Sequence, residues 1–208
     1  MANVLIACEY SGAVRRAFAA LGHTVTSIDL LPSDDGVGEA WDHTYLDVSG
    51  TGCQRHLVGD VLEHLAQLPG HYDMLIGFPP CTHLSASGAR WWPAKRADGR
   101  QQEAVDFFMA LANADVPLIS LENPIGYMST AYRKPDCIVQ PWEHGHGEQK
   151  STCLWLKGLP VLEPTNIVEG RKQKCWLMPE TADRWKKRST TYSGIAAAMA
   201  AQWAPMLP

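Results

Sequence analysis

A single cysteine stands directly after two prolines in the stretch GFPPCTHLS, residues 77–85. Pro79 and Pro80 have a fixed φ and no amide hydrogen, so the chain leaves the preceding apolar run along a stiff, extended path. Such a path aims the next side chain outward, and the small polar residues after it suit a loop that moves over a substrate. A thiolate is a strong nucleophile toward an electron-poor ring carbon. We therefore expect Cys81 to be a nucleophile rather than a buried structural cysteine.

Glu122 is the acid that the sequence offers as a partner for this thiol. It follows the apolar run VPLIS and precedes Asn123 in the stretch LENP. A nucleophilic thiol needs a group that accepts or stabilises the charge developing during its attack, and a carboxyl group can do so. Both GFPPC and SLENP come where apolar runs end, and parallel strands bring such ends to one ligand-binding rim. We predict that Cys81 and Glu122 lie on this rim, with Pro80 and Asn123 completing the catalytic set.

Short apolar runs alternate with helical patterns as far as Pro124. This rhythm predicts right-handed crossovers and an α/β fold with a doubly wound, mostly parallel sheet covered on both faces. Beyond Pro124 an apolar, strand-like run and a closing segment of strong helix formers complete the chain. The expected strands are residues 3–10, 23–30, 72–78, 116–124 and 151–156, and the expected helices are residues 11–22, 61–70, 99–114 and 193–203.

The composition is that of a globular protein. Of the 208 residues, 46% are hydrophobic and 19% are charged, and no apolar run has the length of a membrane span. The first residues lack a basic start and predict a strand rather than a signal peptide. Six cysteines without any C-x-x-C pair argue against a structural zinc site and a disulfide framework. We expect a cytoplasmic protein without a metal site.

The first strand is followed by a turn that could approach a ligand closely. Gly12 opens the first helix, and Asp29 ends the second strand about 20 residues later, where an acid can accept hydrogen bonds from ribose hydroxyls. There is no G-x-G-x-x-G pattern, because Val14 and Arg15 stand near the places of the other glycines. These side chains obstruct a pyrophosphate, so a cofactor without phosphates suits the turn better; a plain strand-to-helix turn is the alternative.

Two further acids extend this end of the predicted sheet. Glu9 lies in the same turn as Gly12 and would meet a cationic ligand favourably. Asp60 stands where a third strand should meet its helix, in GDVLEH. There it could bind an exocyclic amine or serve as a simple helix cap, and the residues alone leave both open.

Positive charge is concentrated toward the end of the chain. Residues 169–188 carry seven Lys and Arg against three acids, a charge of +4 that leaves −8 for the rest of a chain with a net charge of −4. Such a segment is either a solvated surface or a docking site for an anionic partner. A piece this short could hardly bury a core of its own, so we expect a small insertion rather than an independent domain.

Taken in order, these stretches resemble the motifs of the DNA (cytosine-5) methyltransferases. YDMLIGFPPCTHLSASG is similar to the nucleophile segment of that family, and LENP to its glutamate-asparagine-valine motif. The stretches EYSGAVRRAF, SIDL and GDV stand at the places of the S-adenosylmethionine motifs, and TTYSGIAAAMAAQW resembles the last motif. The resemblance covers nearly the whole chain, although only short motifs carry it. It implies a Rossmann-like S-adenosylmethionine-dependent methyltransferase fold.

The resemblance also implies a mechanism and a set of contacts. Cys81 adds to C6 of a cytosine while Glu122 holds the N3 and N4 edge, C5 takes a methyl group, and loss of the C5 proton releases the thiol. In duplex DNA the cytosine is flipped out of the stack. The implied cofactor contacts are Tyr10, Gly12, Asp29, Asp60, Ser193 and Gly194. The expected substrate contacts are Ser85, Ser87, Arg90 and the Trp91-Trp92 pair on the loop, then Lys150, and in the basic segment Arg171, Lys172, Lys174, Trp176, Lys186, Lys187 and Arg188.

The resemblance divides the chain into three parts. Residues 1–157 form the catalytic domain that binds S-adenosylmethionine, residues 158–188 a small target-recognition insertion, and residues 189–208 a C-terminal helix that completes the catalytic domain. So short an insertion contacts few bases and predicts a very short target sequence. Compact members of this kind look like those encoded by phages, which would place the protein in the host cytoplasm.

The sequence departs from the family at the strand that helps to fix the target base. A glutamine and two alternating arginines usually precede it; here Gln149 is kept, but Ser151 and Cys153 stand at the arginine places, and Lys150 or Arg90 is left as the substitute. Two alternatives to DNA methylation therefore stay open. The substrate could be a free nucleotide such as dCMP or an RNA cytosine, or the chain could be a non-catalytic nucleic-acid-binding subunit.

Overall fold

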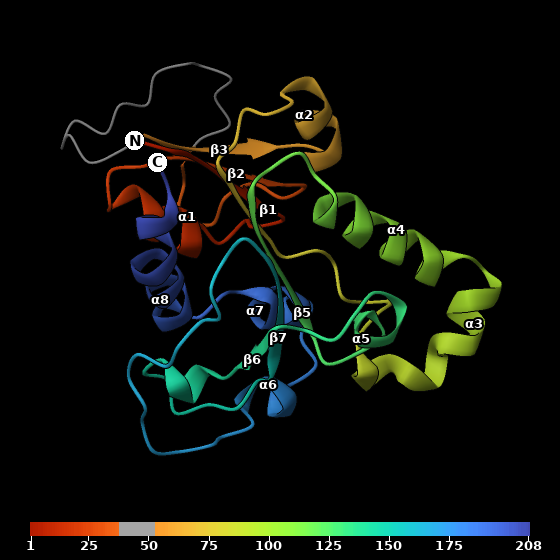
Figure 1. The fold of residues 1–208 in the computed structure, drawn as a ribbon. Helices are drawn as coiled ribbons and strands as arrows, with labels where there is room; N and C mark the ends of the chain where they lie inside the picture. Colours follow the sequence, from red (N-terminus) through yellow and green to blue (C-terminus); the bar gives the residue numbers. More distant parts are fainter. Residues whose placement is uncertain (38–52) are drawn as a thin grey trace.

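A seven-stranded sheet with the strand order β3-β2-β1-β4-β5-β7-β6 runs through the molecule. The computed structural model describes residues 1–37 and 53–208 (Figure 1). Strands β1 to β5 are parallel to one another, whereas β7 runs antiparallel to both β5 and β6. The strands are β1 (Asn3–Ala7), β2 (Thr24–Asp29), β3 (Gln54–Val58), β4 (Met74–Gly77), β5 (Leu118–Pro124), β6 (Cys137–Val139) and β7 (Thr152–Lys157). The predicted doubly wound, mostly parallel α/β fold is confirmed.

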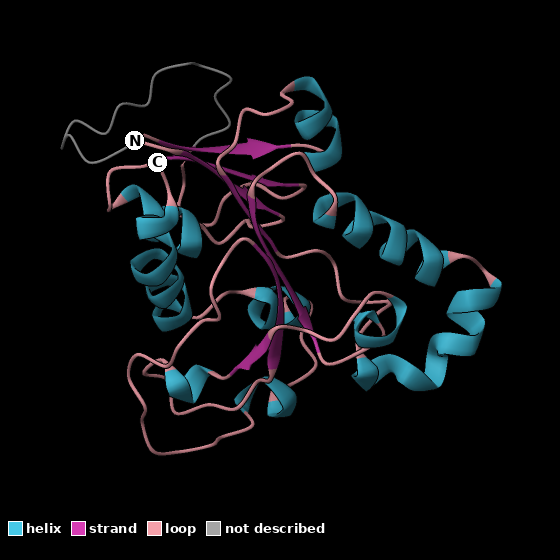
Figure 2. Cartoon of the chain, viewed as in Figure 1, coloured by secondary structure: helices cyan, strands magenta, loops and turns pink. Residues whose placement is uncertain are grey.

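Helices cover the sheet on both faces, as Figure 2 shows. The α-helices are α1 (Ala13–Ala19), α2 (Val61–Gln67), α3 (Trp92–Ala97), α4 (Arg100–Ala112), α5 (Met128–Ala131), α6 (Lys174–Leu177), α7 (Arg184–Ser189) and α8 (Ser193–Trp203). Three 3-10 helices are η1 (Ala86–Trp91), η2 (Pro141–Glu143) and η3 (Ala204–Met206). Among the described residues, none of the helices combines the length and the hydrophobicity that a membrane span requires.

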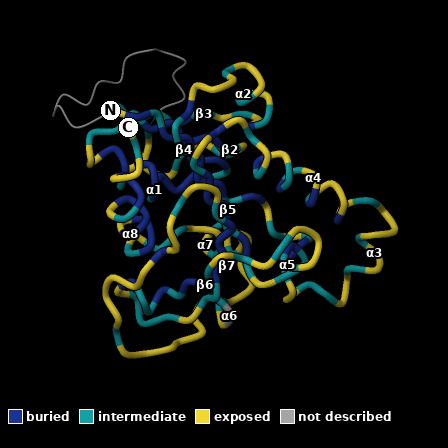
Figure 3. The backbone as a smooth tube through the Cα atoms, in the orientation of Figure 1, coloured by how far each residue is buried: buried dark blue, intermediate teal, exposed yellow. Residues whose placement is uncertain are grey.

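Alternation along the strands divides the core into two layers. In β1, Val4 and Ile6 pack with α1 and α8, whereas Leu5 and Ala7 pack with α2 and α4. Figure 1 draws α1 and α8 on one side of the strands and α4 on the other, and Figure 3 shows the buried stretches gathered along the sheet between them. The closing helix α8 has buried residues around most of its circumference, which explains why an alanine-rich segment is stable there.

The elements agree with the predicted ones apart from their ends. The first strand stops at Ala7 instead of continuing to residue 10, because Cys8 takes a positive φ of 59° and turns the chain out of the sheet. Residues 86–97 form η1 and α3, so the prediction of one long loop after Cys81 is wrong. There Ser85 accepts a hydrogen bond from the amide of Ser87 and starts the first turn of η1.

Candidate active site at the carboxyl edge of the sheet

The segment after β4 carries Cys81 along a path fixed by hydrogen bonds. The amide of Phe78 still donates to the Ala7 carbonyl at 2.9 Å, and the Asn123 side chain donates to the Pro79 carbonyl at 2.9 Å. Asn123 is only 1% exposed, so this bond is shielded from water. Beyond the prolines, the Cys81 carbonyl accepts the amides of Leu84 and Ser85 at 3.0 and 2.9 Å. The rigid aim expected from the two prolines is thus reinforced on both sides of the thiol.

Glu122 lies near the end of β5, beside the strand that carries Cys81. The ladder pairs Gly77 of β4 with Leu121 of β5, so the two chains reach the edge of the sheet side by side. The charge of Glu122 is close enough to raise the pKa of the Cys81 thiol, which burial already raises. Burial also raises the pKa of Glu122 above its usual value, while Lys150 and a hydrogen bond with Thr152 counteract this shift. A carboxyl group with a raised pKa favours its protonated form, which can donate a hydrogen bond.

The segments that follow Cys81 and Glu122 are fastened to each other. An antiparallel bridge joins Ser85 to Gly126, the amide of Ala86 donates to the Ile125 carbonyl at 2.9 Å, and that of Tyr127 to the Leu84 carbonyl at 2.8 Å. A Cβ on Gly126 would lie 2.2 Å from the Leu84 oxygen, so only glycine permits this approach. The structure therefore brings Ser85 to the loop that follows Glu122.

The tryptophan pair is divided between two environments. Trp91 is 56% exposed, with the Arg90 guanidinium 5.0 Å from its ring centroid, and Ser85 and Ser87 hydrogen-bond to each other at the start of the same 3-10 helix. Trp92 instead packs edge-on against Tyr127 at 5.4 Å. Only the first tryptophan is available to a substrate, while the second one anchors the helix.

Three neighbouring strand ends make up the predicted cofactor side of the edge. Cys8 follows β1, Asp29 ends β2 and Asp60 follows β3. Both acids act on the Cys8 thiol, and together with burial they raise its pKa to about 12. Asp29 and Asp60 therefore lie on the same side of the end of β1, because β2 and β3 follow it in that order across the sheet. These acids suit a ligand that offers hydroxyl or amine hydrogens and positive charge.

Each acid at this end also has a structural task. Asp60 caps α2, with its Oδ1 accepting the amides of Leu62 and Glu63 at 2.7 and 3.3 Å, so the alternative of a helix cap is realised. Asp29 accepts the amide of Leu31 at 2.9 Å. Glu9 is buried and accepts the amides of Val14 and Arg15 at the start of α1, so its carboxylate is engaged there rather than turned toward a ligand.

Tyr10 and Gly12 have internal roles that the sequence did not predict. The hydroxyl of Tyr10 contacts the Lys186 carbonyl, Ser189 and Thr190, so this buried ring fastens α7 to the turn after β1. Gly12 has a φ of 66°, and a Cβ there would lie 2.5 Å from the Asp35 carboxylate. The glycine is therefore required by packing within the chain, whether or not a ligand approaches.

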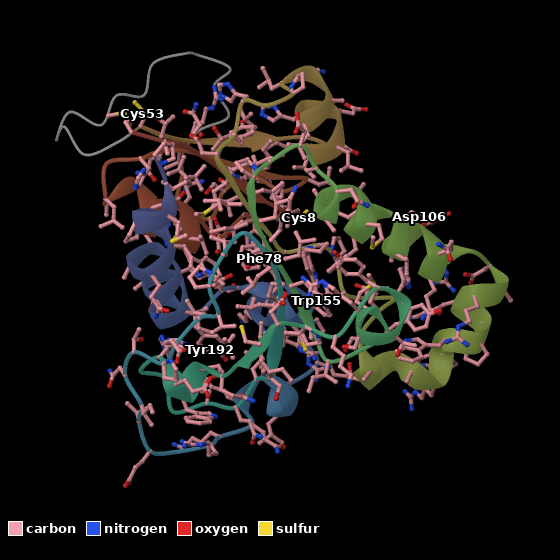
Figure 4. All side chains as sticks on the ribbon, viewed as in Figure 1. Cys8, Cys53, Phe78, Asp106, Trp155 and Tyr192 are labelled. Atoms are coloured by element: carbon pink, nitrogen blue, oxygen red, sulfur yellow. The ribbon has the colours of Figure 1, made fainter. Side chains whose placement is uncertain are left out.

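Ser193 and Gly194 begin α8 against the segment that precedes β7. The amide of Gly194 donates to His146 Nε2 at 3.0 Å, and the Ser193 hydroxyl lies 3.5 Å from the same nitrogen. A Cβ on Gly194 would lie 1.8 Å from the His144 carbonyl oxygen. Tyr192, labelled in Figure 4, donates to Glu148 at 2.7 Å. These contacts pack α8 onto residues 144–148, and they do not place Ser193 and Gly194 beside Asp29 or Asp60.

The basic segment is held by acids, aromatic rings and backbone. Lys186 pairs with Asp34 at 2.5 Å, Lys187 with Asp183 at 2.5 Å and Lys174 with Glu148 at 3.2 Å. The Arg171 guanidinium lies 3.7 Å from the centroid of Trp142, and Lys172 is bound through its backbone to Gly147 and Gln149. Trp176 lies in α6, but its side chain is outside the part that the structure describes.

Arg188 is the residue of this segment that the structure brings to the catalytic pair. Its charge lowers the pKa of Cys81, as does that of Lys150, although the net shift of this thiol remains upward. The ammonium of Lys150 donates to the Arg188 carbonyl at 2.9 Å. Cys81, Glu122, Lys150 and Arg188 therefore form one electrostatic group drawn from four separate segments.

Sequence reasoning missed the polar support behind the cofactor side. Arg15 of α1 is fully buried, where it pairs with Asp35 at 2.5 Å and donates to Ser27 at 2.7 Å. Ser27 in turn contacts His56, whose other ring nitrogen reaches the Leu31 carbonyl at 2.8 Å. In the sequence, the burial of Arg15 is indicated only by its position among small apolar residues in a short amphipathic helix. Among residues 1–37 and 53–208, no group of three His, Cys, Asp or Glu side chains could hold a metal ion.

The sheet order and the antiparallel β7 are those of the Rossmann-like S-adenosylmethionine-dependent methyltransferase fold. The sequence matches no protein-family model, and no curated protein is significantly similar to it. One similar solved structure is the bifunctional kinase-methyltransferase WbdD, at 15% identity and a TM-score of 0.42, over 77% of this chain and 36% of that chain. Another is the Entamoeba histolytica methyltransferase EhMeth, at 13% identity and a TM-score of 0.46, over 88% of this chain and 62% of that chain. Likenesses at this level carry no argument about function, which has to come from the residues of the site.

Proposed function

We propose that this protein transfers a methyl group from S-adenosylmethionine to C5 of cytosine in DNA at a short target sequence, through covalent attack by Cys81. The observation that carries the proposal is the proximity of the Cys81 thiol to the Glu122 carboxyl group at adjoining strand ends. A thiol and an acid so placed can act on two edges of one pyrimidine ring. The acids Asp29 and Asp60 at the neighbouring strand ends support a methyl donor that is a sulfonium ion.

In this mechanism the protein groups have separate tasks. Cys81 forms an Sγ–C6 bond, while the protonated Glu122 donates a hydrogen bond to N3 and so makes C5 more nucleophilic. Bound S-adenosylmethionine would supply an electrophilic methyl group, with Asp29 on its ribose and Asp60 near its adenine amine. After C5 has gained the methyl group, loss of the C5 proton restores the C5–C6 double bond and breaks the bond to Cys81. Asn123 holds the Pro79 carbonyl and thereby the path of the thiol.

Docking of DNA falls to the 158–188 insertion, with the C-terminal helix of residues 189–208 completing the catalytic domain of residues 1–157. Arg188 lies close to Cys81, and Arg90, Trp91 and Ser85 lie on or beside the loop joined to the Glu122 loop. Duplex DNA requires the cytosine to be flipped out, and the exposed Trp91 is well placed for stacking against a displaced base.

A free nucleotide or an RNA cytosine is the second candidate substrate, and one observation favours it. Lys174, Lys186 and Lys187, which were expected to grip phosphates, each pair with an acid of the same chain. Such surface pairs are weak and exchange with other anions, so they reduce the phosphate-binding charge without abolishing it.

The test measures transfer of a labelled methyl group into duplex DNA, dCMP and transfer RNA in parallel. We expect labelled DNA, with methylcytosines enriched in one short sequence context. A DNA oligonucleotide with 5-fluorocytosine in that context should trap the enzyme, because C5 then has no proton to lose. Labelling of dCMP alone would identify the free nucleotide as the substrate in place of DNA. Absence of both transfer and adduct would favour a non-catalytic binding subunit.

A further inference from the structure

We propose that Lys150 is the activating cation of the Cys81–Glu122 pair and that the end of helix α7 holds it in position. The proposal deepens the methyltransferase function and rests on it for the use of Cys81 in catalysis. The electrostatic effect of Lys150 on this pair can be tested in the free protein, because Cys81, Glu122, Lys150 and Arg188 lie together without a substrate. It also decides between Lys150 and Arg90, which the sequence left open as substitutes for the missing arginines.

The ladder between β5 and β7 brings the chain before β7, which carries Lys150, to the end of β5 that carries Glu122. Glu122 pairs with Leu154, and residues directly opposite in an antiparallel pair share a face of the sheet. Side chains alternate along a strand, so Thr152 lies on the same face as Leu154, and Lys150 precedes the start of β7 by two residues. Thr152 is close enough to Glu122 to lower the pKa of that carboxyl group, which agrees with this placement. The ammonium group therefore approaches the carboxyl group from the end of the neighbouring strand.

The backbone around Lys150 is clamped by one side chain. The amide oxygen of Gln140 accepts the Lys150 amide at 3.1 Å, and its nitrogen donates to the Ser151 hydroxyl at 2.6 Å. Gln140 is itself fixed, because its amide donates to Glu143 at 2.7 Å in a capping box. The lysine therefore starts from a defined point at the edge of the sheet.

Helix α7 fixes the other end of the Lys150 side chain. The last carbonyl groups of a helix have no partner within it, and here they accept bonds from outside. The ammonium of Lys150 donates to the Arg188 carbonyl at 2.9 Å, and the hydroxyl of Tyr10 contacts the Lys186 carbonyl. The ion pair between Lys186 and Asp34 ties the same helix to the cofactor side. One short basic helix thus connects the turn after β1 with the catalytic cation.

The surroundings of Arg90 exclude it from this role. Its guanidinium lies over the Trp91 ring at 5.0 Å, and Arg90 is exposed. Glu122, Lys150 and Arg188 shift the Cys81 pKa, and among residues 1–37 and 53–208 Lys150 is the cation that also acts on Glu122. A positive charge here stabilises the thiolate and, during attack, the negative charge that develops on the ring.

The experiment follows alkylation of Cys81 by iodoacetamide, without cofactor or nucleic acid, from about pH 7 to about pH 12. Peptide mass spectrometry separates Cys81 from the other five cysteines. In Lys150→Met we expect the midpoint to move upward by up to about one pH unit. The rate at neutral pH should fall by only about threefold, since a thiolate of higher pKa is also the stronger nucleophile. Lys150→Arg should restore the midpoint.

Lys157→Met is the matched control. Lys157 ends the same strand, and its ammonium also donates to a backbone carbonyl, that of Ala114 at 3.4 Å. We expect its profile to coincide with that of the wild-type protein. An unchanged profile for Lys150→Met, or equal losses for Lys150→Met and Lys150→Arg in variants with wild-type unfolding midpoints, would overturn the proposal. Cys81-dependent trapping by 5-fluorocytosine would then still support the methyltransferase function, so the two failures are distinguishable.

Discussion

Two thiols at neighbouring strand ends stand in different electrostatic surroundings. Cys8 follows β1, and the charges that act on it are those of Asp29 and Asp60, which with burial raise its pKa to about 12. Cys81 follows β4 and also faces an acid, Glu122, but Lys150 and Arg188 counteract that acid. Figure 4 labels Cys8 among the side chains close to the sheet. Two cysteines at the same edge of one sheet therefore have different electrostatic surroundings.

The difference teaches that cations from distant segments distinguish the surroundings of Cys81 from those of Cys8. Burial and the charges of Asp29 and Asp60 disfavour the thiolate form of Cys8. Cys81 receives Lys150 from the chain before β7 and Arg188 from α7. Neither cation is near Cys81 in the sequence, so their effect on this thiol arises only when the chain folds.

The strongest way to break the comparison is to remove each thiol in turn. Cys81→Ala should lower methyl transfer at least about a thousandfold, because the covalent step is lost. Cys8→Ala should retain the covalent adduct with a 5-fluorocytosine oligonucleotide at saturating S-adenosylmethionine. Gel shift under denaturing conditions measures the covalent adduct in each variant. A fully active Cys81→Ala protein, or an adduct that needs Cys8, would reverse the assignment of the nucleophile.

Asn123 tests whether the Cys81 side depends on rigid aim. Asn123→Asp keeps the shape but removes the donor to the Pro79 carbonyl, which is bound at 2.9 Å. We expect kcat to fall by about 10- to 100-fold, the loss typical of a reacting group displaced by about 1 Å. Unfolding in urea should show a loss of about 1 to 3 kcal/mol for the buried, unpaired carbonyl. Wild-type kcat in this variant would show that the prolines alone fix the thiol.

Glu122 sharpens the comparison because its two effects have opposite signs. Its carboxylate raises the pKa of Cys81, so Glu122→Gln should lower that pKa and speed alkylation of the free protein at a fixed pH by up to about threefold. Methyl transfer should fall in the same variant, because the proton donor to the base is weakened. Iodoacetamide kinetics and methyl transfer are measured on one preparation. Slower alkylation would contradict the proximity of the two groups.

The smallest effect concerns the support beneath the Cys8 side. Arg15 and Arg16 share the Asp35 carboxylate, but the side chain of Arg15 is 0% exposed and that of Arg16 is 49% exposed. Arg15→Met should cost about 1 to 3 kcal/mol of unfolding free energy, since it leaves Ser27 and Asp35 without a buried donor. Arg16→Met should cost less than about 1 kcal/mol. Equal unfolding midpoints for the two variants would show that the buried pair contributes nothing beyond the surface pair.

Patterns local to the chain predicted most of the fold. Short apolar runs predicted β1, β2, β4, β5 and β7, and the alanine-rich closing segment predicted α8 at Ser193–Trp203. The short strand β6 at Cys137–Val139 escaped prediction, because a three-residue strand carries too little periodic pattern. The stretch of η1 and α3 was taken for a loop, since its small residues favour one locally.

The site divides in the same way. The PPC and LENP stretches predicted Cys81 and Glu122 at one edge, because parallel strands must end together. The roles of Tyr10, Gly12 and Glu9 could not be read from the chain, since each depends on a partner that folding brings close: Lys186 for Tyr10, Asp35 for Gly12 and the amides of α1 for Glu9.

By itself, the sequence determined which residues can react and which strands carry them to the edge, because side-chain chemistry and hydrophobic period are local properties. Only the tertiary structure decided which cations reach the thiol. Lys150 and Arg188 act on Cys81 through space, and their positions depend on the β5–β7 register and on the hydrogen bond that joins them. Electrostatic interactions weaken as the distance between two charges in space increases. The number of residues between them along the chain does not indicate that distance.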